Sequence, residues 1–312
     1  MKRFVGVLVV LTFLASICLL SVAFSQGQSE LANQNKIVAR LRNDHDEDKN
    51  KDAHPGEAGK PARPGGNGIS YHGGPVMLGT NHMYYIWYGN WGTNTANTIL
   101  TSLAQNIGGS PYFNINTTYY NGSNVHVSNS VSFGGSVNTG SGVYGTSLTD
   151  AEIQSIVRDA LVSGALPYDT SGIYFVLTSA EVTASSGFCT QYCGWHTYGT
   201  INGFNIKYSF VGNPDRCPSA CEAQTTGPNG NAGADGMASI IAHELEEAVT
   251  DPNLNAWYDT RGAENADKCA WTFGTTTLLP SGARYNMTFG GRNYLIQQNW
   301  VNASGGFCAK SF

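Results

Sequence analysis

Hydrophobic positions beyond residue 67 follow two different periods, and these predict both strands and helices. Alternating or continuous apolar residues predict strands at 83–89, 173–177 and 205–211, a strand or hairpin at 124–137, and a hairpin at 285–300. Helical spacing predicts helices at 94–107 and 149–161, and a third helix that starts at an Asp235 cap and stops before Pro252. We therefore expect an α+β fold with a mixed sheet in a single domain at 67–312.

The first 66 residues have the composition of targeting and linker segments. A short basic start is followed by an apolar run at 4–24 and by small residues around Phe24, which is typical of a secretory signal peptide at 1–25. The alternative is an uncleaved anchor, since about 20 apolar residues can span a bilayer. Residues 26–66 are charged and rich in Gly and Pro, which predicts a disordered linker or a removable pro-segment. The globular domain is then secreted.

The overall composition narrows the possible partners. The chain has 312 residues, of which 41% are hydrophobic and 12% charged, and such a composition excludes a disordered protein. Its 17 Lys and Arg against 22 Asp and Glu give a formal net charge of −5 with no basic patch, so we expect no nucleic-acid partner. We also expect no membrane span after signal cleavage, and a monomer.

Six cysteines follow the predicted signal peptide, and an even number in an exported chain favours disulfides. They are Cys189, Cys193, Cys217, Cys221, Cys269 and Cys308. The C-x-x-x-C spacing of the first four favours two local bridges, within 189–193 and within 217–221, which leaves Cys269 to join Cys308. The alternative is a zinc–thiolate site, but the spacing is wider than C-x-x-C and thiolates oxidise readily outside the cell.

The predicted third helix carries the most promising chemistry. His243 and Glu247 are four residues apart and therefore neighbours on one helix face, where an imidazole and a carboxylate can converge on a cation. Glu244 projects beside them, in the position of a general base in an H-E-x-x-H metallopeptidase. The alternative is a solvated acidic helix face without a metal.

The segment after this helix supplies further acidic residues. Seven Asp and Glu lie between 244 and 267, and charges of one sign at this density repel unless they are solvated or neutralised. Glu264 is the expected third metal ligand, with Asp267 and Asp259 as alternatives, because a catalytic zinc takes three protein ligands and keeps an open position.

The ligand types bear on which cation binds. We expect Zn²⁺, but one His and two carboxylates make a formally neutral site that acidifies bound water less than a site with two His. Ca²⁺ or Mn²⁺, or a purely structural role, are the alternatives.

The remaining histidines are weaker candidates. His196 follows Cys193 on a predicted disulfide-fixed loop, where it is a hydrogen-bonded loop residue, a ligand or a substrate contact. His72 and His82 are expected to be structural, and His126 to face solvent.

Several segments carry a resemblance to the EXORDIUM, or phosphate-induced, family of plant extracellular proteins. They are HGGPVMLG (72–79), IWYG (86–89), FCTQYCGWH (188–196), NPDRCPSAC (213–221) and ARYNMTFGGRNYL (283–295) with the final cysteine. The resemblance implies a secreted cell-wall protein linked to growth and nutrient response, with no settled biochemical activity.

A second, local resemblance concerns HELEEAVTDP (243–252), which is similar to the active-site helix of zincin metallopeptidases of the HELTHAVT type. His243 and Glu244 match the first ligand and the base, Glu247 stands where the second His would be, and Glu264 lies downstream where a glutamate ligand would be. The resemblance implies zinc-dependent hydrolysis of a peptide.

Two hypotheses for function follow. In the first, the chain is a secreted zinc hydrolase in which Glu244 activates water, His196 helps to hold the oxyanion, and the substrate is a peptide or cell-wall polymer. In the second, it is a non-catalytic extracellular binding module of the EXORDIUM type, with a structural metal or none. A degenerate peptidase with neither metal nor activity is a third possibility.

Overall fold

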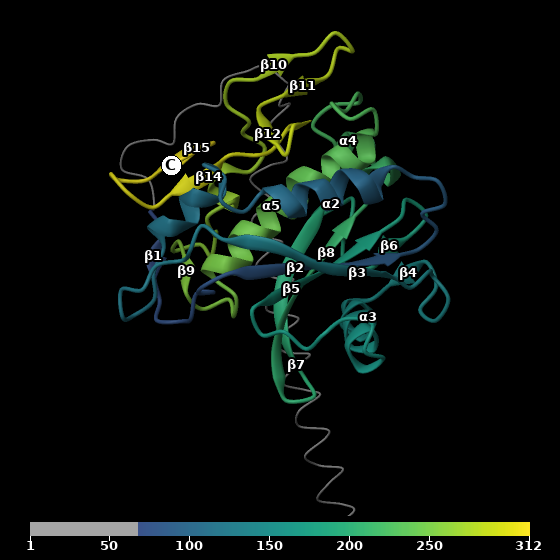
Figure 1. The fold of residues 1–312 in the computed structure, drawn as a ribbon, viewed down its shortest axis with the longest axis horizontal. Coiled ribbons are helices and arrows are strands. Elements are labelled where there is room, and N and C mark those ends of the chain that lie inside the picture. Colours follow the sequence, from purple (N-terminus) through teal and green to yellow (C-terminus); the bar gives the residue numbers. More distant parts are fainter. Residues whose placement is uncertain (1–67) are drawn as a thin grey trace, which may run out of the picture. The chain divides into compact units, whose positions relative to one another are not determined.

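A five-stranded sheet runs through the middle of residues 68–312, the part of the chain that the computed structural model describes (Figure 1). In spatial order its strands are β3 (Val131–Asn138), β2 (Asn81–Tyr88), β5 (Gly172–Thr178), β8 (Phe204–Gly212) and β7 (Gly194–Ile201). The first four are mutually parallel, whereas β7 forms an antiparallel hairpin with β8 at one edge. The sheet is therefore mixed, as the sequence predicts.

Helices cover both faces of this sheet (Figure 1). They are α2 (Ala96–Asn106) and α5 (Ala232–Thr250) side by side on one face, and α3 (Asp150–Val162) on the other. Strands covered on both sides become continuous apolar runs, which explains why β2 and β5 are almost entirely buried. The Tyr85 hydroxyl donates a hydrogen bond to the Leu100 carbonyl and so ties β2 to α2.

Shorter elements surround this core. The short helices are η2 (Phe113–Thr118), η3 (Pro214–Arg216), α4 (Pro218–Cys221) and η4 (Asp267–Cys269). The short strands pair as β1 (Ser70–Tyr71) with β9 (Trp257–Tyr258), β4 (Ser147–Leu148) with β6 (Thr183–Ala184), β10 (Thr277–Leu278) with β11 (Arg284–Tyr285), β12 (Met287–Phe289) with β13 (Arg292–Tyr294), and β14 (Asn299–Val301) with β15 (Phe307–Ala309).

Most of the predicted elements are confirmed, with two local corrections. The capping box of α3 forms, because the Thr149 side chain accepts from the Glu152 N–H while the Glu152 carboxylate accepts from the Thr149 N–H. The predicted Asp235 cap is wrong: Asn231 caps α5, and Asp235 lies in its first turn, where its carboxylate accepts from Asn229. Of the segment 124–137, predicted as a strand or hairpin, only the part from Val131 onward forms a strand.

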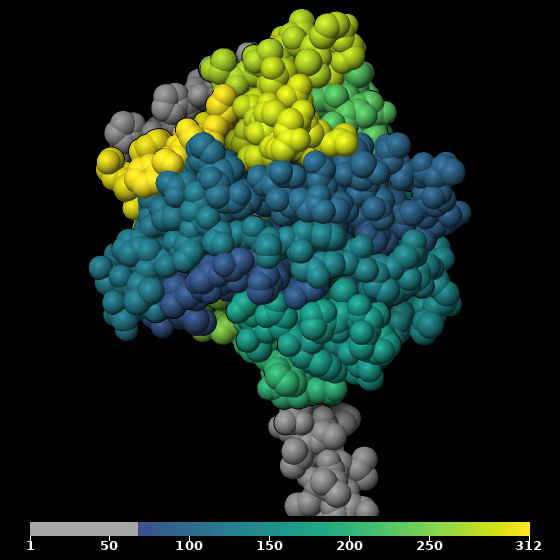
Figure 2. Space-filling model, in the orientation of Figure 1, coloured from purple at the N-terminus to yellow at the C-terminus, as the bar shows by residue number. Residues whose placement is uncertain are grey.

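The segment from β12 to the C-terminus packs against α2 and the loop that follows it, and Figure 2 shows them forming one continuous surface. Gly290 and Gly291 both have positive φ, which the tight turn between β12 and β13 requires. From β13, the Tyr294 hydroxyl donates to the Ile99 carbonyl of α2 at 2.9 Å. The Phe312 N–H donates to the Pro111 carbonyl at 3.0 Å.

The disulfides correct the predicted local pairing. Cys189 joins Cys217 and Cys193 joins Cys221, whereas the predicted bridge between Cys269 and Cys308 is confirmed. The reason is the hairpin of β7 and β8, which brings the segment before β7 next to the segment after β8. Two cysteines four residues apart on each side then face each other.

The predicted signal peptide at 1–25 and linker at 26–66 lie outside the described residues. Within residues 68–312, no helix has the length and hydrophobicity needed to cross a membrane.

Candidate metal centre

The acidic residues of α5 are buried. Glu244, Glu246 and Glu247 are each at most 3% exposed, so the alternative of a solvated helix face is wrong. The Asn231 side chain accepts from the Ala234 N–H at the start of the helix, and the helix ends at Thr250, two residues before Pro252. Carboxylates buried in this way require compensating positive charge or protons.

His196 lies on strand β7, and the prediction that it sits on a loop is wrong. Strand β7 and helix α5 approach each other closely at Gly194, where an added Cβ would fall 2.5 Å from Ile240 Cγ2 and 3.1 Å from Glu244 Oε1. Since His196 is two residues further along the same strand, its side chain is on the same face as that contact. The strand thus presents the imidazole to the acidic helix.

We expect the substitution Gly194→Ala to separate this strand from α5. The added methyl group overlaps Ile240, and overpacking of this kind typically costs about 1–3 kcal/mol. Thermal unfolding should show a lower melting temperature. Gly142→Ala is the matched control, because a Cβ at Gly142 meets nothing within 4 Å. Equal stability of the two variants would contradict the close approach.

The segment after α5 returns to the helix and brings two acidic residues to it. The Asp267 N–H donates to Glu247 Oε1 at 3.1 Å, and the Glu264 N–H donates to Asp267 Oδ2 at 3.0 Å. Asp259, the other predicted alternative, instead forms an ion pair with Lys268 at 2.9 Å. The backbone of this segment therefore positions Glu264 and Asp267, and not Asp259, beside the helix.

Two histidines and three carboxylates converge at this point. His243 Nε2 lies 3.0 Å from Glu247 Oε1 and 3.3 Å from Asp267 Oδ1. His196 Nε2 lies 3.1 Å from Glu264 Oε2 and 3.7 Å from Glu247 Oε2. Among the described residues these donors form two groups of three, each with its ligand atoms within 4.8 Å of one another, and Glu247 belongs to both groups. The four predicted ligands are thus brought together with His196.

The electrostatics of the cluster favour bound positive charge. Burial raises the pKa of Glu247 to about 7, and repulsion from Asp267 adds to this while His243 opposes it. Burial acts to lower the pKa of His243, but the neighbouring Glu247 and Asp267 outweigh it and hold that pKa well above its usual value. Burial also raises the pKa of Glu244 well above its usual range. Burial therefore disfavours ionised carboxylates here, and a divalent cation at this point would offset their charge.

Glu246 belongs to a different environment. Its Oε2 accepts a hydrogen bond from Asn299 Nδ2 at 2.6 Å, on another side of the helix from Glu247. Burial raises its pKa well above the ordinary value, although the nearby side-chain amides of Asn116 and Asn299 oppose the shift. This glutamate therefore joins α5 to β14 and lies outside both groups of potential ligands.

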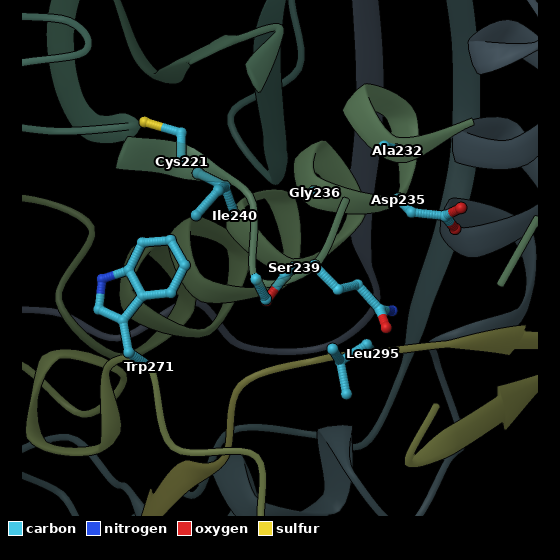
Figure 3. Close-up of a pocket in the computed structure, with 10 residues that line it drawn as sticks. Cys221, Ala232, Asp235, Gly236, Ser239, Ile240, Trp271 and Leu295 are labelled. Carbon is cyan, nitrogen blue, oxygen red and sulfur yellow. The ribbon is translucent and has the colours of Figure 1, made fainter. Parts of the chain in front are cut away.

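A small pocket, open to solvent, lies along the turns of α5 that precede His243 (Figure 3). Ser239 and Ile240 of the helix line it together with Trp271 and Leu295 from the C-terminal region. Ile240 is one helical turn before Glu244, but neither Glu244 nor any residue of the cluster lines the pocket.

Comparison with known proteins places the chain in a family. Residues 69–309 match the conserved region of phosphate-induced protein 1. The chain belongs to the phosphate-induced protein 1 family. It is 32% identical to EXORDIUM-like 3 of Arabidopsis thaliana over 270 residues, which cover 74% of this chain and 80% of the relative. It is 26% identical to PHOSPHATE-INDUCED 1 of Nicotiana tabacum over 219 residues, or 61% and 67% of the two chains. No solved structure matches it.

The family predicted from the sequence is thereby confirmed for this phosphate-induced protein. EXORDIUM-like 5 of Arabidopsis thaliana is a further relative, at 31% identity over 272 residues that cover 74% of this chain and 75% of the relative. None of these three names is that of a metallopeptidase. Metal binding and hydrolysis therefore remain predictions for this member of the phosphate-induced family.

The sequence analysis did not predict that His196 lies on a strand and joins the metal-ligand cluster. The short spacing of the flanking cysteines favoured a loop, but residues 194–201 form a strand in which every second side chain shares a face. The signal that could have revealed it is the aromatic and β-branched composition of this segment, which contains Trp195, Tyr198 and Ile201.

Proposed function

We propose that this protein is a secreted, non-catalytic extracellular module whose fold is stabilised by a divalent cation at the cluster of His243 and Glu247. The observation that carries metal binding is the convergence of two histidines and three carboxylates around Glu247. The three disulfides support export, because such bonds persist in oxidising compartments. The names of the relatives specify no reaction, which favours a binding module, and the proposed partner is a cell-wall polymer.

The donors favour a transition-metal cation. Imidazole suits Zn²⁺, whereas Ca²⁺ takes six to eight oxygen ligands, and carboxylates also suit Mn²⁺. Zn²⁺ is the cation we propose, with Mn²⁺ ahead of Ca²⁺ as the alternative. Ligands at zinc bond lengths and tetrahedral angles lie about 3.3 Å apart, and the distances from 3.0 to 3.7 Å around the two histidines agree with this spacing.

Metal content of the purified full-length protein tests this proposal. We expect mass spectrometry to find bound zinc that is reduced in His243→Ala and retained in His126→Ala, whose exposed imidazole lies outside the cluster. Chelation should also lower the melting temperature, since a ligand at 100 times its Kd stabilises a fold by about 2.7 kcal/mol. A native protein that stays metal-free after dialysis against Zn²⁺ and Mn²⁺ would refute the proposal.

Hydrolysis is the second candidate, and Glu244 is the observation that favours it. Its Oε2 atom is buried and has no hydrogen-bond partner. A bound Zn²⁺ would supply Lewis acidity and an acidic water. Glu244 would then accept a proton from that water. His196 suits a ligand better than an oxyanion donor, because its Nε2 already faces two carboxylates.

The substitution Glu244→Gln separates the two functions. In a hydrolase, the variant should keep its metal and lose roughly 100-fold or more in the rate of peptide cleavage, the usual contribution of a general base. In a binding module, the metal-loaded native protein should cleave no peptide, and the substitution should leave its affinity for cell-wall polymer unchanged. A variant that loses its metal would show that Glu244 is a ligand.

A further inference from the structure

We propose that the cluster holds two divalent cations, of the Zn²⁺ or Mn²⁺ kind, bridged by the carboxylate of Glu247. This inference rests on the proposed metal-binding function and deepens it. One cation would bind His243, Asp267 and one oxygen of Glu247. The other would bind His196, Glu264 and the second oxygen of Glu247.

The two oxygens of Glu247 face different histidines. Oε1 lies 3.0 Å from His243 Nε2, whereas Oε2 lies 3.7 Å from His196 Nε2. The five donor residues accordingly divide into two groups of three that share only Glu247. Two ions held by the two oxygens of one carboxylate would be about 3.5–4 Å apart, the usual separation in two-metal sites.

A single ion leaves two of the five donor residues unused. At bond lengths of about 2.0–2.1 Å, an ion can engage only donors that lie close to one another. If it bound His243, Glu247 and Asp267, the pair of His196 and Glu264, 3.1 Å apart, would remain buried without a cation. Each group consists of one imidazole, one carboxylate that belongs to that group alone, and the shared Glu247. The ligand types therefore favour neither group over the other.

Glu244 follows His243 on α5, and its Oε1 atom lies at the close approach of β7 to the helix. Glu244 Oε2 is buried without a hydrogen-bond partner, so this oxygen is available to a water bound at the cations.

The stoichiometry of the full-length protein tests the inference. After dialysis against Zn²⁺ and removal of weakly bound metal, mass spectrometry should find two ions per chain. We expect His196→Ala and His243→Ala each to retain one ion, and His126→Ala to retain both. One ion in the native protein, with no loss in His196→Ala, would overturn the pair and leave the proposed single-cation function standing. No metal in any sample would overturn both.

Electron paramagnetic resonance of the Mn²⁺-loaded native protein tests the pair without relying on variants, which matters because His196 is buried. Two Mn²⁺ ions bridged by a carboxylate couple magnetically, so we expect a coupled spectrum with halved hyperfine spacing. In His196→Ala and His243→Ala, an uncoupled six-line spectrum should replace it. A six-line spectrum from the saturated native protein would overturn the inference.

Discussion

Glu247→Gln is expected to strip the purified protein of bound metal. Glu247 is the one residue common to both groups of ligands, and each of its oxygens faces a different histidine. An amide keeps the shape of the side chain but offers one neutral oxygen and no charge. Loss of a supporting residue around a metal typically weakens affinity 10–100-fold, so loss of this ligand should cost at least about 100-fold. Isothermal titration with Zn²⁺ measures the change.

The neighbouring glutamate provides a matched control. Glu246 is equally buried on the same helix, but its carboxylate accepts from Asn299 and lies outside both ligand groups. The change to an amide at this position therefore removes no potential ligand, and the amide oxygen can still accept from Asn299. Glu246→Gln should therefore bind Zn²⁺ as the native protein does. Equal metal loss in both variants would indicate damage to α5, and equal retention would show that Glu247 is no ligand.

Removal of the disulfide between Cys269 and Cys308 is expected to lower both stability and metal affinity. The bridge closes a stretch with a sequence separation of 39, for which loop-closure entropy gives a stabilisation of about 4 kcal/mol. In a domain of this size the double substitution to Ser should lower the melting temperature by roughly 10 °C. Cys269 lies two residues after Asp267, so freeing it should also weaken zinc binding about tenfold.

The bridge between Cys189 and Cys217 is the control for the second effect. It anchors the segment before β7, and the parallel bridge from Cys193 to Cys221 still holds that segment when it is removed. Its double substitution to Ser should reduce stability by a smaller amount and leave zinc affinity unchanged. If both disulfide variants lost the same metal affinity, the effect would reflect general loosening of the fold.

Local sequence features predicted the main helices and strands, including the helix that bears His243 and Glu247. The capping box at Thr149, the apolar runs of β2 and β5 and the stop at Pro252 act within a few residues, so their effect does not depend on the rest of the fold. The pairing of His243 with Glu247 is likewise a property of any helix through these positions, and the structure places them 3.0 Å apart. The family also follows from motifs in the sequence.

Only the tertiary structure determined how the remaining residues of the site reach this helix. His196 reaches the cluster because β7 folds back beside β8 and against α5, and Glu264 and Asp267 reach it because the chain after α5 returns to the helix. The same hairpin brings the four cysteines together in two disulfides, each between residues 28 positions apart, and not in the local pairs that their spacing predicted. The burial of the acidic residues of α5 could not be predicted from the helix sequence alone. Buried carboxylates need compensating groups, and other elements supply part of them. Contacts between residues far apart in the chain determine these features, and helix and strand periods carry no information about them.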